Sequence, residues 1–146
     1  MALWKLHGDG SLQPGAVLAP DERLSIRRFP EMSGIPTILT IRRQSDGGEF
    51  VEGEGSRTVM LARGLAFADT DHRKNFAYVD LEEDIQVPSI EEAARAFGTR
   101  IIRSVHDMTG PIENLRARVQ RLRRTKDEIV KVAFMPRNLS DVTRLF

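Results

Sequence analysis

The sequence predicts an α/β fold in which strands and helices alternate along the chain. Segments rich in Ile, Val and Thr, which favour strands, are separated by segments whose apolar residues recur at helical spacing. The chain of 146 residues is long enough for one domain with a substantial core. This alternation favours right-handed βαβ units and a parallel sheet, either doubly wound or barrel-like.

The N-terminal lead differs from the rest of the chain in composition. Residues 1–20 are rich in Gly and Pro and show no sustained periodicity, which predicts a poorly structured segment. We therefore expect the folded domain to comprise residues 21–146. Its first element is a short helical turn over residues 21–29, because a Pro-Asp start precedes Leu24 and Ile26.

The next segments predict one strand and one long helix. IPTILTIRR, residues 35–43, has the Ile and Thr content of a strand. The Asp-Gly-Gly sequence that follows predicts a loop over residues 44–50. Residues 56–70 place apolar side chains near helical spacing, and Ser56 is a residue type suited to the N-cap of that helix.

The second half of the chain repeats the alternation. One helix begins at Ser89 and has Gly98 beyond its end, and the next opens with a proline and carries an apolar stripe on one face. The predicted elements are strand 76–83, helix 89–97, strand 99–107, helix 111–126, strand 129–134 and a final helix from residue 138.

The composition excludes several classes of function. Lys plus Arg total 22 and Asp plus Glu total 21, so the net charge of +1 gives no general attraction for nucleic acid or an anionic membrane. The absence of cysteine excludes disulfides, thiol catalysis and thiolate metal sites. No apolar run has the roughly 20 residues of a membrane helix. We expect a cytoplasmic protein without nucleic-acid or membrane partners, in which the basic helix 111–126 is a solvated face.

Polar residues gather near the ends of the predicted strands, where parallel α/β sheets carry their chemistry. The most unusual is Lys131 inside the apolar strand IVKVAF, which either snorkels to water or has a chemical task. If the last two strands are neighbours, alternation allows Lys131 and His106 to face one cavity. The other polar residues near these ends are Arg42, Arg43, Asp46, Asp80, Glu82 and Asp107.

A lysine and a histidine facing one cavity suggest carbonyl chemistry. Apolar surroundings favour the uncharged amine of a lysine, which can attack a carbonyl and form a Schiff base. The resulting iminium acidifies the adjacent carbon, and a histidine is suited to remove that proton and return it later. The pair therefore predicts elimination or aldol chemistry, with Lys131 as the nucleophile and His106 as the acid–base.

Four motifs in order make the chain resemble type I 3-dehydroquinate dehydratase. They are ILTIRRQSDGGEF, YVDLE, RSVHDMTGP and EIVKVAFMPRNLSDVTRLF, and the resemblance extends over about residues 21–146. It implies a (β/α)8 barrel that converts 3-dehydroquinate to 3-dehydroshikimate in the shikimate pathway, without a metal or organic cofactor. A different Schiff-base aldolase would explain the lysine but not the ordered motifs around it.

The resemblance also implies roles for individual residues. Lys131 corresponds to the Schiff-base lysine and His106 to the acid–base histidine of the family. Arg42 corresponds to an arginine that contacts the substrate. Asp46 corresponds to an acidic residue, often Glu, that orients the histidine. Glu82 and Asp107 are expected to support these groups.

The family barrel has eight strands and about 250 residues, so the four strands predicted here imply a partial (β/α)8 TIM-barrel-like fold. The family's Glu-x-Arg motif should precede PDERLSIRR, where this chain has SLQPGAVLA. Two hypotheses follow. Either the chain is a dehydratase, or it is a catalytically incompetent fragment that keeps the Lys/His pair and acts, if at all, through association. In both cases we expect a homo-oligomer, such as a dimer, or another association that covers the open barrel.

Overall fold

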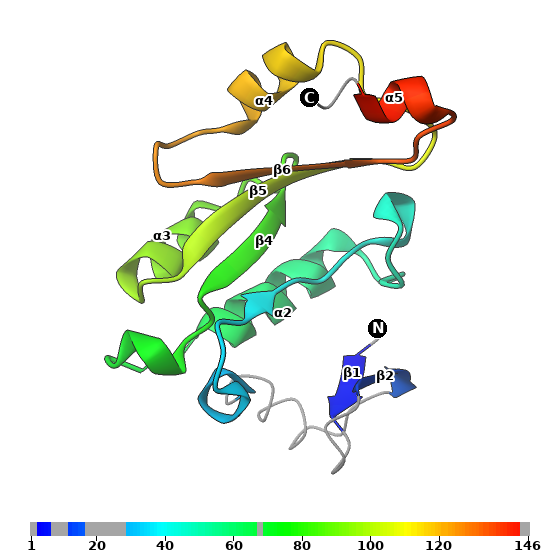
Figure 1. The fold of residues 1–146 in the computed structure, drawn as a ribbon. Helices are drawn as coiled ribbons and strands as arrows, with labels where there is room; N and C mark the ends of the chain where they lie inside the picture. The colour runs from blue at the N-terminus through cyan, green and yellow to red at the C-terminus, as the bar shows by residue number, and fades with distance from the viewer. Residues whose placement is uncertain (1–2, 7–11, 17–28, 67–68, 144–146) are drawn as a thin grey trace.

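The computed structural model describes residues 3–6, 12–16, 29–66 and 69–143. Its centre is a four-stranded parallel sheet in the order β3-β4-β5-β6 (Figure 1). A doubly wound sheet would reverse its strand order at a switch point. The consecutive order therefore corresponds to the barrel-like alternative. The strands are β3 (Ile38–Leu39), β4 (Tyr78–Glu82), β5 (Arg100–Asp107) and β6 (Ile129–Phe134).

Helices connect the strands, as the predicted alternation requires. Helix α3 packs on β5, and α4 packs on both β5 and β6. Residues 29–33 are helical as well. The longer elements are α2 (Glu54–Leu65), α3 (Pro88–Ala96), α4 (Leu115–Leu122) and α5 (Leu139–Thr143), with 3-10 turns η1 (Gln44–Asp46) and η2 (His72–Lys74).

The two faces of the sheet differ in chemistry because side chains alternate along a strand. In β4, Val79 and Leu81 are fully buried in the apolar core, which includes Leu61 and Leu65 of α2 and Ile90 of α3. Asp80 and Glu82 alternate with Val79 and Leu81 along β4 and therefore point to the opposite face of the sheet. The helices thus cover an apolar face, and the other face receives the polar residues.

The strand register brings these polar residues together. Glu82 of β4 lies opposite Ser104 of β5, and Ser104 lies opposite Lys131 of β6. His106 is two residues beyond Ser104 and therefore shares its face. The strands that carry His106 and Lys131 are therefore neighbours, as predicted.

The predicted strand over residues 35–43 is much shorter in the structure. Only Ile38 and Leu39 pair with β4. Further along, the carbonyl oxygens of Arg42 and Arg43 accept hydrogen bonds from the backbone N–H groups of Phe50 and Gly48, at 3.1 and 2.8 Å. The chain therefore bonds to its own Asp-Gly-Gly loop instead of extending the ladder.

The predicted helix over residues 56–70 begins earlier and ends sooner. Gly53, with extended backbone, is the N-cap, so the expectation for Ser56 is wrong. The Ser56 hydroxyl donates to the Glu52 carboxylate at 2.6 Å and is not available to cap a backbone N–H group. The helix ends at Leu65 because Ala66 is extended, and residues 67–68 lie outside the described part.

The N-terminal lead contains structure that its composition did not predict. Strands β1 (Leu3–Leu6) and β2 (Leu12–Ala16) pair in antiparallel orientation (Figure 1). Two short segments separated by a Gly-Asp-Gly sequence can pair through backbone groups alone, without an apolar pattern. The helical turn predicted over residues 21–29 falls almost entirely outside the described residues. The domain boundary at residue 20 stays a prediction.

Among the residues that the structure describes, no helix combines the length and the apolar character needed to cross a membrane.

Candidate active site

The candidate site lies on the polar face of the sheet, toward the carboxyl ends of β4, β5 and β6. Arg42, from the segment after β3, is its centre. One guanidinium nitrogen, Nη1, donates to Glu82 Oε1 at 2.5 Å and lies 3.3 Å from Ser104 Oγ. The other, Nη2, donates to Asp80 Oδ2 at 2.6 Å. The arginine thus bridges three positions on two strands and fixes the floor of the site.

Lys131 is oriented by Asp80. Its Nζ donates to Asp80 Oδ2 at 2.9 Å, and 44% of its side chain is exposed. Apolar groups therefore do not enclose this lysine. Because its neighbours in β6 point away from it by alternation, Lys131 faces charged groups and the open side of the sheet. Its amine is accessible to a ligand that approaches this face.

Asp80 is the anion that balances Lys131 and Arg42. Burial raises the pKa of Asp80, but hydrogen bonds from Ser104 and Lys131 and the charge of Arg42 outweigh this, so its pKa lies below the ordinary value. The Ser104 hydroxyl, which is fully buried, donates to the other carboxylate oxygen, Oδ1. Asp80 consequently remains ionised and holds the lysine in place.

His106 completes the group predicted from the sequence. Burial, followed by the charges of Arg42 and Lys131, lowers the pKa of His106 to about 4. The imidazole is therefore neutral near pH 7 and is able to accept a proton. Arg42 Nη1 lies 3.0 Å from His106 Nδ1. Since the guanidinium can only donate, Nδ1 accepts and Nε2 carries the ring proton in this arrangement.

Asp46, predicted to orient the histidine, bonds elsewhere. Its Oδ2 accepts from Arg43 Nε at 2.6 Å. Arg43 also binds Asp84, at 2.6 Å from Nη1, and lies 3.4 Å from Glu54. Arg43 thus joins three acidic side chains beside the site. The orienting role of Asp46 stays a prediction.

The two predicted supporting residues have different surroundings. Glu82 is buried and accepts from Arg42 on one oxygen and from Arg57 on the other, the latter at 2.8 Å. Burial raises the pKa of Glu82 against the lowering effect of both arginines. Asp107 instead accepts from the backbone N–H groups of Thr109 and Gly110, at 2.8 and 3.2 Å, and so shapes the loop after β5.

Sequence reasoning missed two contributors, Arg57 and Ser104. Both had a signal. Ser104 is two residues from His106 on a strand and therefore shares its face. Arg57 is four residues before Leu61 on α2, which puts it on the buried face of that helix, and its side chain has no exposed surface. A charged residue at an apolar position of a helix indicates a buried partner.

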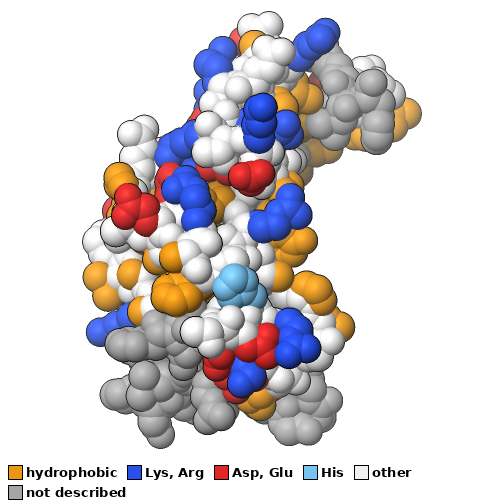
Figure 2. Space-filling view, turned by 90° about the vertical axis from the view of Figure 1, so that its left-hand side faces the viewer, with side chains coloured by type: hydrophobic (Ala, Val, Ile, Leu, Met, Phe, Trp, Pro, Cys, Tyr) orange, Lys and Arg blue, Asp and Glu red, His pale blue; other side chains and the backbone are white. Residues whose placement is uncertain are grey.

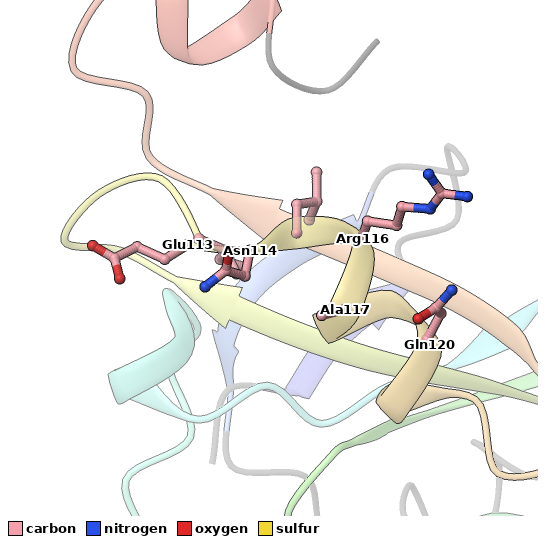
Figure 3. Close-up of a pocket in the computed structure, with 7 residues that line it drawn as sticks. Glu113, Asn114, Arg116, Ala117 and Gln120 are labelled. Atoms are coloured by element: carbon pink, nitrogen blue, oxygen red, sulfur yellow. The ribbon is translucent and has the colours of Figure 1, made fainter.

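Other parts of the described chain offer less to a ligand. No group of three or more His, Asp or Glu side chains there is placed to hold a metal ion. A shallow depression of about 710 Å³ lies over the start of α4, lined by Glu113, Asn114, Arg116 and Gln120 among others (Figure 3). Glu113, Arg116 and Gln120 point outward, and none of the site residues described above lines it.

The basic helix α4 has acidic neighbours. Arg118 pairs with Glu83, and Arg124, just beyond the helix, pairs with Glu91 at 2.8 Å. Figure 2 shows basic side chains spread over one face of the molecule with acidic ones between them. This mixture of signs is typical of a solvated surface. The expectation of no nucleic-acid partner stays a prediction.

The fold and the site define a class: an α/β protein of the barrel type with charged and ionisable groups at the carboxyl ends of its parallel strands. A family model described as type I 3-dehydroquinase matches residues 22–146. The chain belongs to the type I 3-dehydroquinase family. The resemblance carried by the four sequence motifs is thereby confirmed.

Relatives of this chain are longer than it is. It is 33% identical over 135 residues to the 3-dehydroquinate dehydratase of Methanothermobacter thermautotrophicus, covering 91% of this chain and 53% of that protein. With the enzyme of the same name from Aromatoleum aromaticum it shares 30% identity over 118 residues, covering 77% and 44%. The chain spans about half the length of the curated relatives it matches.

Solved structures support the fold. The 3-dehydroquinate dehydratase structure from Geobacillus kaustophilus superposes with a TM-score of 0.68 at 22% identity, over 84% of this chain and 49% of that one. The structure from Aquifex aeolicus gives a TM-score of 0.60 at 20% identity, over 86% and 66%. The partial barrel predicted from the sequence is confirmed at the level of fold.

Proposed function

We propose that this chain is a lyase that dehydrates 3-dehydroquinate to 3-dehydroshikimate through a Schiff base on Lys131, a step of the shikimate pathway. The observation that carries this proposal is the convergence of Lys131, His106 and Arg42 on one sheet face. Relatives at 30 and 33% identity bear the name of this enzyme. Lys131 supplies the nucleophile once its nitrogen has lost a proton, and the neutral imidazole supplies the base that such a reaction needs.

The proposed reaction conserves atoms in three steps. Lys131 gives up one proton to solvent, and its free amine adds to the substrate carbonyl carbon. One proton then returns as the carbonyl oxygen leaves as water, which gives the iminium. His106 removes a proton from the adjacent carbon, and the electron pair forms the new carbon–carbon double bond as the β-hydroxyl leaves. The proton on His106 returns to this hydroxyl, which departs as a second water. Addition of water to the iminium then releases the product and restores the amine.

Arg42 must change partners for His106 to act as the base from Nε2. In the structure Nδ1 accepts from Arg42, so the lone pair available for catalysis is already engaged. A bound substrate hydroxyl or carboxylate that attracts Arg42 would release Nδ1 to take up the ring proton. Nε2 would then be free to accept a proton from the substrate. Substrate binding and activation of the base are therefore linked through one guanidinium.

Intact-mass measurement after borohydride reduction tests the proposed function. Protein incubated with 3-dehydroquinate and then reduced is expected to gain the mass of one covalent adduct, because borohydride converts the iminium to a stable amine. Peptide mapping should place it on Lys131. A folded protein that gains no adduct would overturn the lyase proposal and favour the incompetent-fragment hypothesis.

We further propose that a second copy of the chain pairs at the free edge of β6. Among the described residues β5 is the only strand bonded to β6, and an unpaired strand edge is a template for another chain. Met135 and Leu139, which follow β6 in the chain, are apolar and 50% and 78% exposed. We expect light scattering to give the mass of a dimer at high protein concentration. A monomer at every concentration would contradict this.

A further inference from the structure

Arg57 of α2 is buried and contacts residues that form or carry the site. Its side chain has no exposed surface. Nη1 donates to Glu82 Oε2 at 2.8 Å and to the backbone carbonyl oxygen of Ile41 at 3.3 Å. Nε donates to Glu54 Oε2 at 3.1 Å. A buried arginine with three acceptors on three segments is fixed in one geometry.

Two of these contacts lead directly to Arg42. Ile41 precedes it in the chain, so Arg57 holds the backbone that carries Arg42. Glu82 accepts from Arg57 on Oε2 and from Arg42 on Oε1, so the same carboxylate is clamped between two guanidinium groups. Arg42 in turn contacts His106 Nδ1. An unbroken series of contacts therefore runs from the buried helix face of α2 to the imidazole.

Burial raises the pKa of Glu82, and the charges of Arg42 and then Arg57 oppose this effect. A buried carboxylate without sufficient cationic partners takes up a proton, because burial penalises the charged form. A protonated Glu82 would be a weaker acceptor for Arg42, whose guanidinium would then be less firmly held at the floor of the site. Loss of Arg57 thus changes the position of Arg42 and does so more strongly at low pH.

We propose that Arg57 is a positioning residue for the dehydration reaction, acting through Glu82 and the Ile41 backbone to hold Arg42 at the floor of the site, within reach of the bound substrate. This inference rests on the proposed function. Arg57 contacts neither Lys131 nor His106 in the structure, so its effect is expected through geometry and charge. Misplacement of reacting groups by about 1 Å lowers rates by about a hundredfold, which sets the scale of the effect.

Arg103 provides a matched control. It too has no exposed surface, and it binds two carboxylates and one carbonyl, namely Glu91 at 2.9 Å, Glu128 at 2.8 Å and the Ile85 oxygen at 3.3 Å. However, Arg103 alternates with Ser104 and therefore points to the helix-covered face of β5. Its removal costs stability in the same way and leaves the polar face unchanged.

The test compares Arg57→Met, Arg57→Lys and Arg103→Met by the rate at which the conjugated dehydration product forms, read by its absorbance across the acid pH range. We expect Arg57→Met to react about 10- to 100-fold more slowly, with the acid limb of its profile moved to higher pH. Arg57→Lys keeps the charge but cannot reach three acceptors, so it should slow the reaction and leave the acid limb near that of the wild type. Arg103→Met should keep both the wild-type rate and profile.

Each other outcome has a defined meaning. An unchanged pH profile in Arg57→Met, or an equal shift in Arg103→Met, would overturn the positioning role. If Arg57→Met does not fold, a wild-type rate in Arg57→Lys would overturn it. If the wild-type chain forms no adduct, the proposed function fails. The carboxyl carbon of Glu82, followed by NMR in each variant, then shows whether Arg57 controls its ionisation.

Discussion

Replacement of Lys131 by alanine is expected to abolish the borohydride-stable adduct and to lower turnover of 3-dehydroquinate by about a thousandfold or more, the scale seen when a covalent nucleophile is removed. The physical reason is that the amine forms the only bond between protein and substrate, and no other lysine is placed beside Arg42 and His106 among the described residues. Intact mass and the absorbance of the conjugated product measure the two effects.

Lys126 is the matched control for this substitution. It is exposed and lies before β6, away from the polar face, so Lys126→Ala should retain the adduct and the turnover of the wild type. Circular dichroism checks that both variants remain folded. An adduct of equal yield in Lys131→Ala would show that the imine forms elsewhere and would remove the main support of the proposed mechanism.

Replacement of His106 by glutamine should separate imine formation from elimination. The Lys131 amine remains, so the adduct is expected to form and to accumulate. Turnover should fall by about 10²- to 10⁴-fold, the usual contribution of a positioned acid–base group. Single-turnover mass spectrometry distinguishes the substrate adduct from the dehydrated one. His72→Gln, on the exposed η2 turn, should leave both quantities unchanged.

The pH profile of the wild-type chain adds a second test of His106. Because its pKa is lowered to about 4, the neutral imidazole persists below the ordinary histidine value of 6.5. Protonation on the acid side therefore removes the base only as the pH approaches 4, and activity should be kept at pH 5.5. An acid limb centred near 6.5 and absent in His106→Gln would contradict the electrostatic account of the site.

Much of the fold followed from patterns that need no tertiary information. The alternation of strand and helix signals gave the parallel sheet, and period-two alternation gave the shared face of Lys131 and His106. Both depended only on backbone geometry and on the adjacency of consecutive strands. The register between β5 and β6 places Lys131 opposite Ser104, which is two residues before His106 on the same face.

The partners of long charged side chains did not follow from the sequence. Arg42, Arg43 and Arg57 each have several carboxylates within reach, and which one they bind depends on how the loop after β3 and helix α2 pack. Asp46 illustrates this, because a neighbouring arginine holds it although its position in the motif suggested the histidine. The strand pair β1 and β2 escaped prediction for another reason, since backbone pairing does not require an apolar pattern.

The alternation of polar and apolar residues in β6 also selects the correct fold. A slip of β6 by one residue against β5 would turn Lys131 toward the helices and bring Val130 or Val132 onto the charged face. The lysine would then be buried without Asp80, and Asp80 would lose one of its two cationic partners. The residues proposed for catalysis therefore discriminate against mispaired sheets while the chain folds, before any substrate is bound.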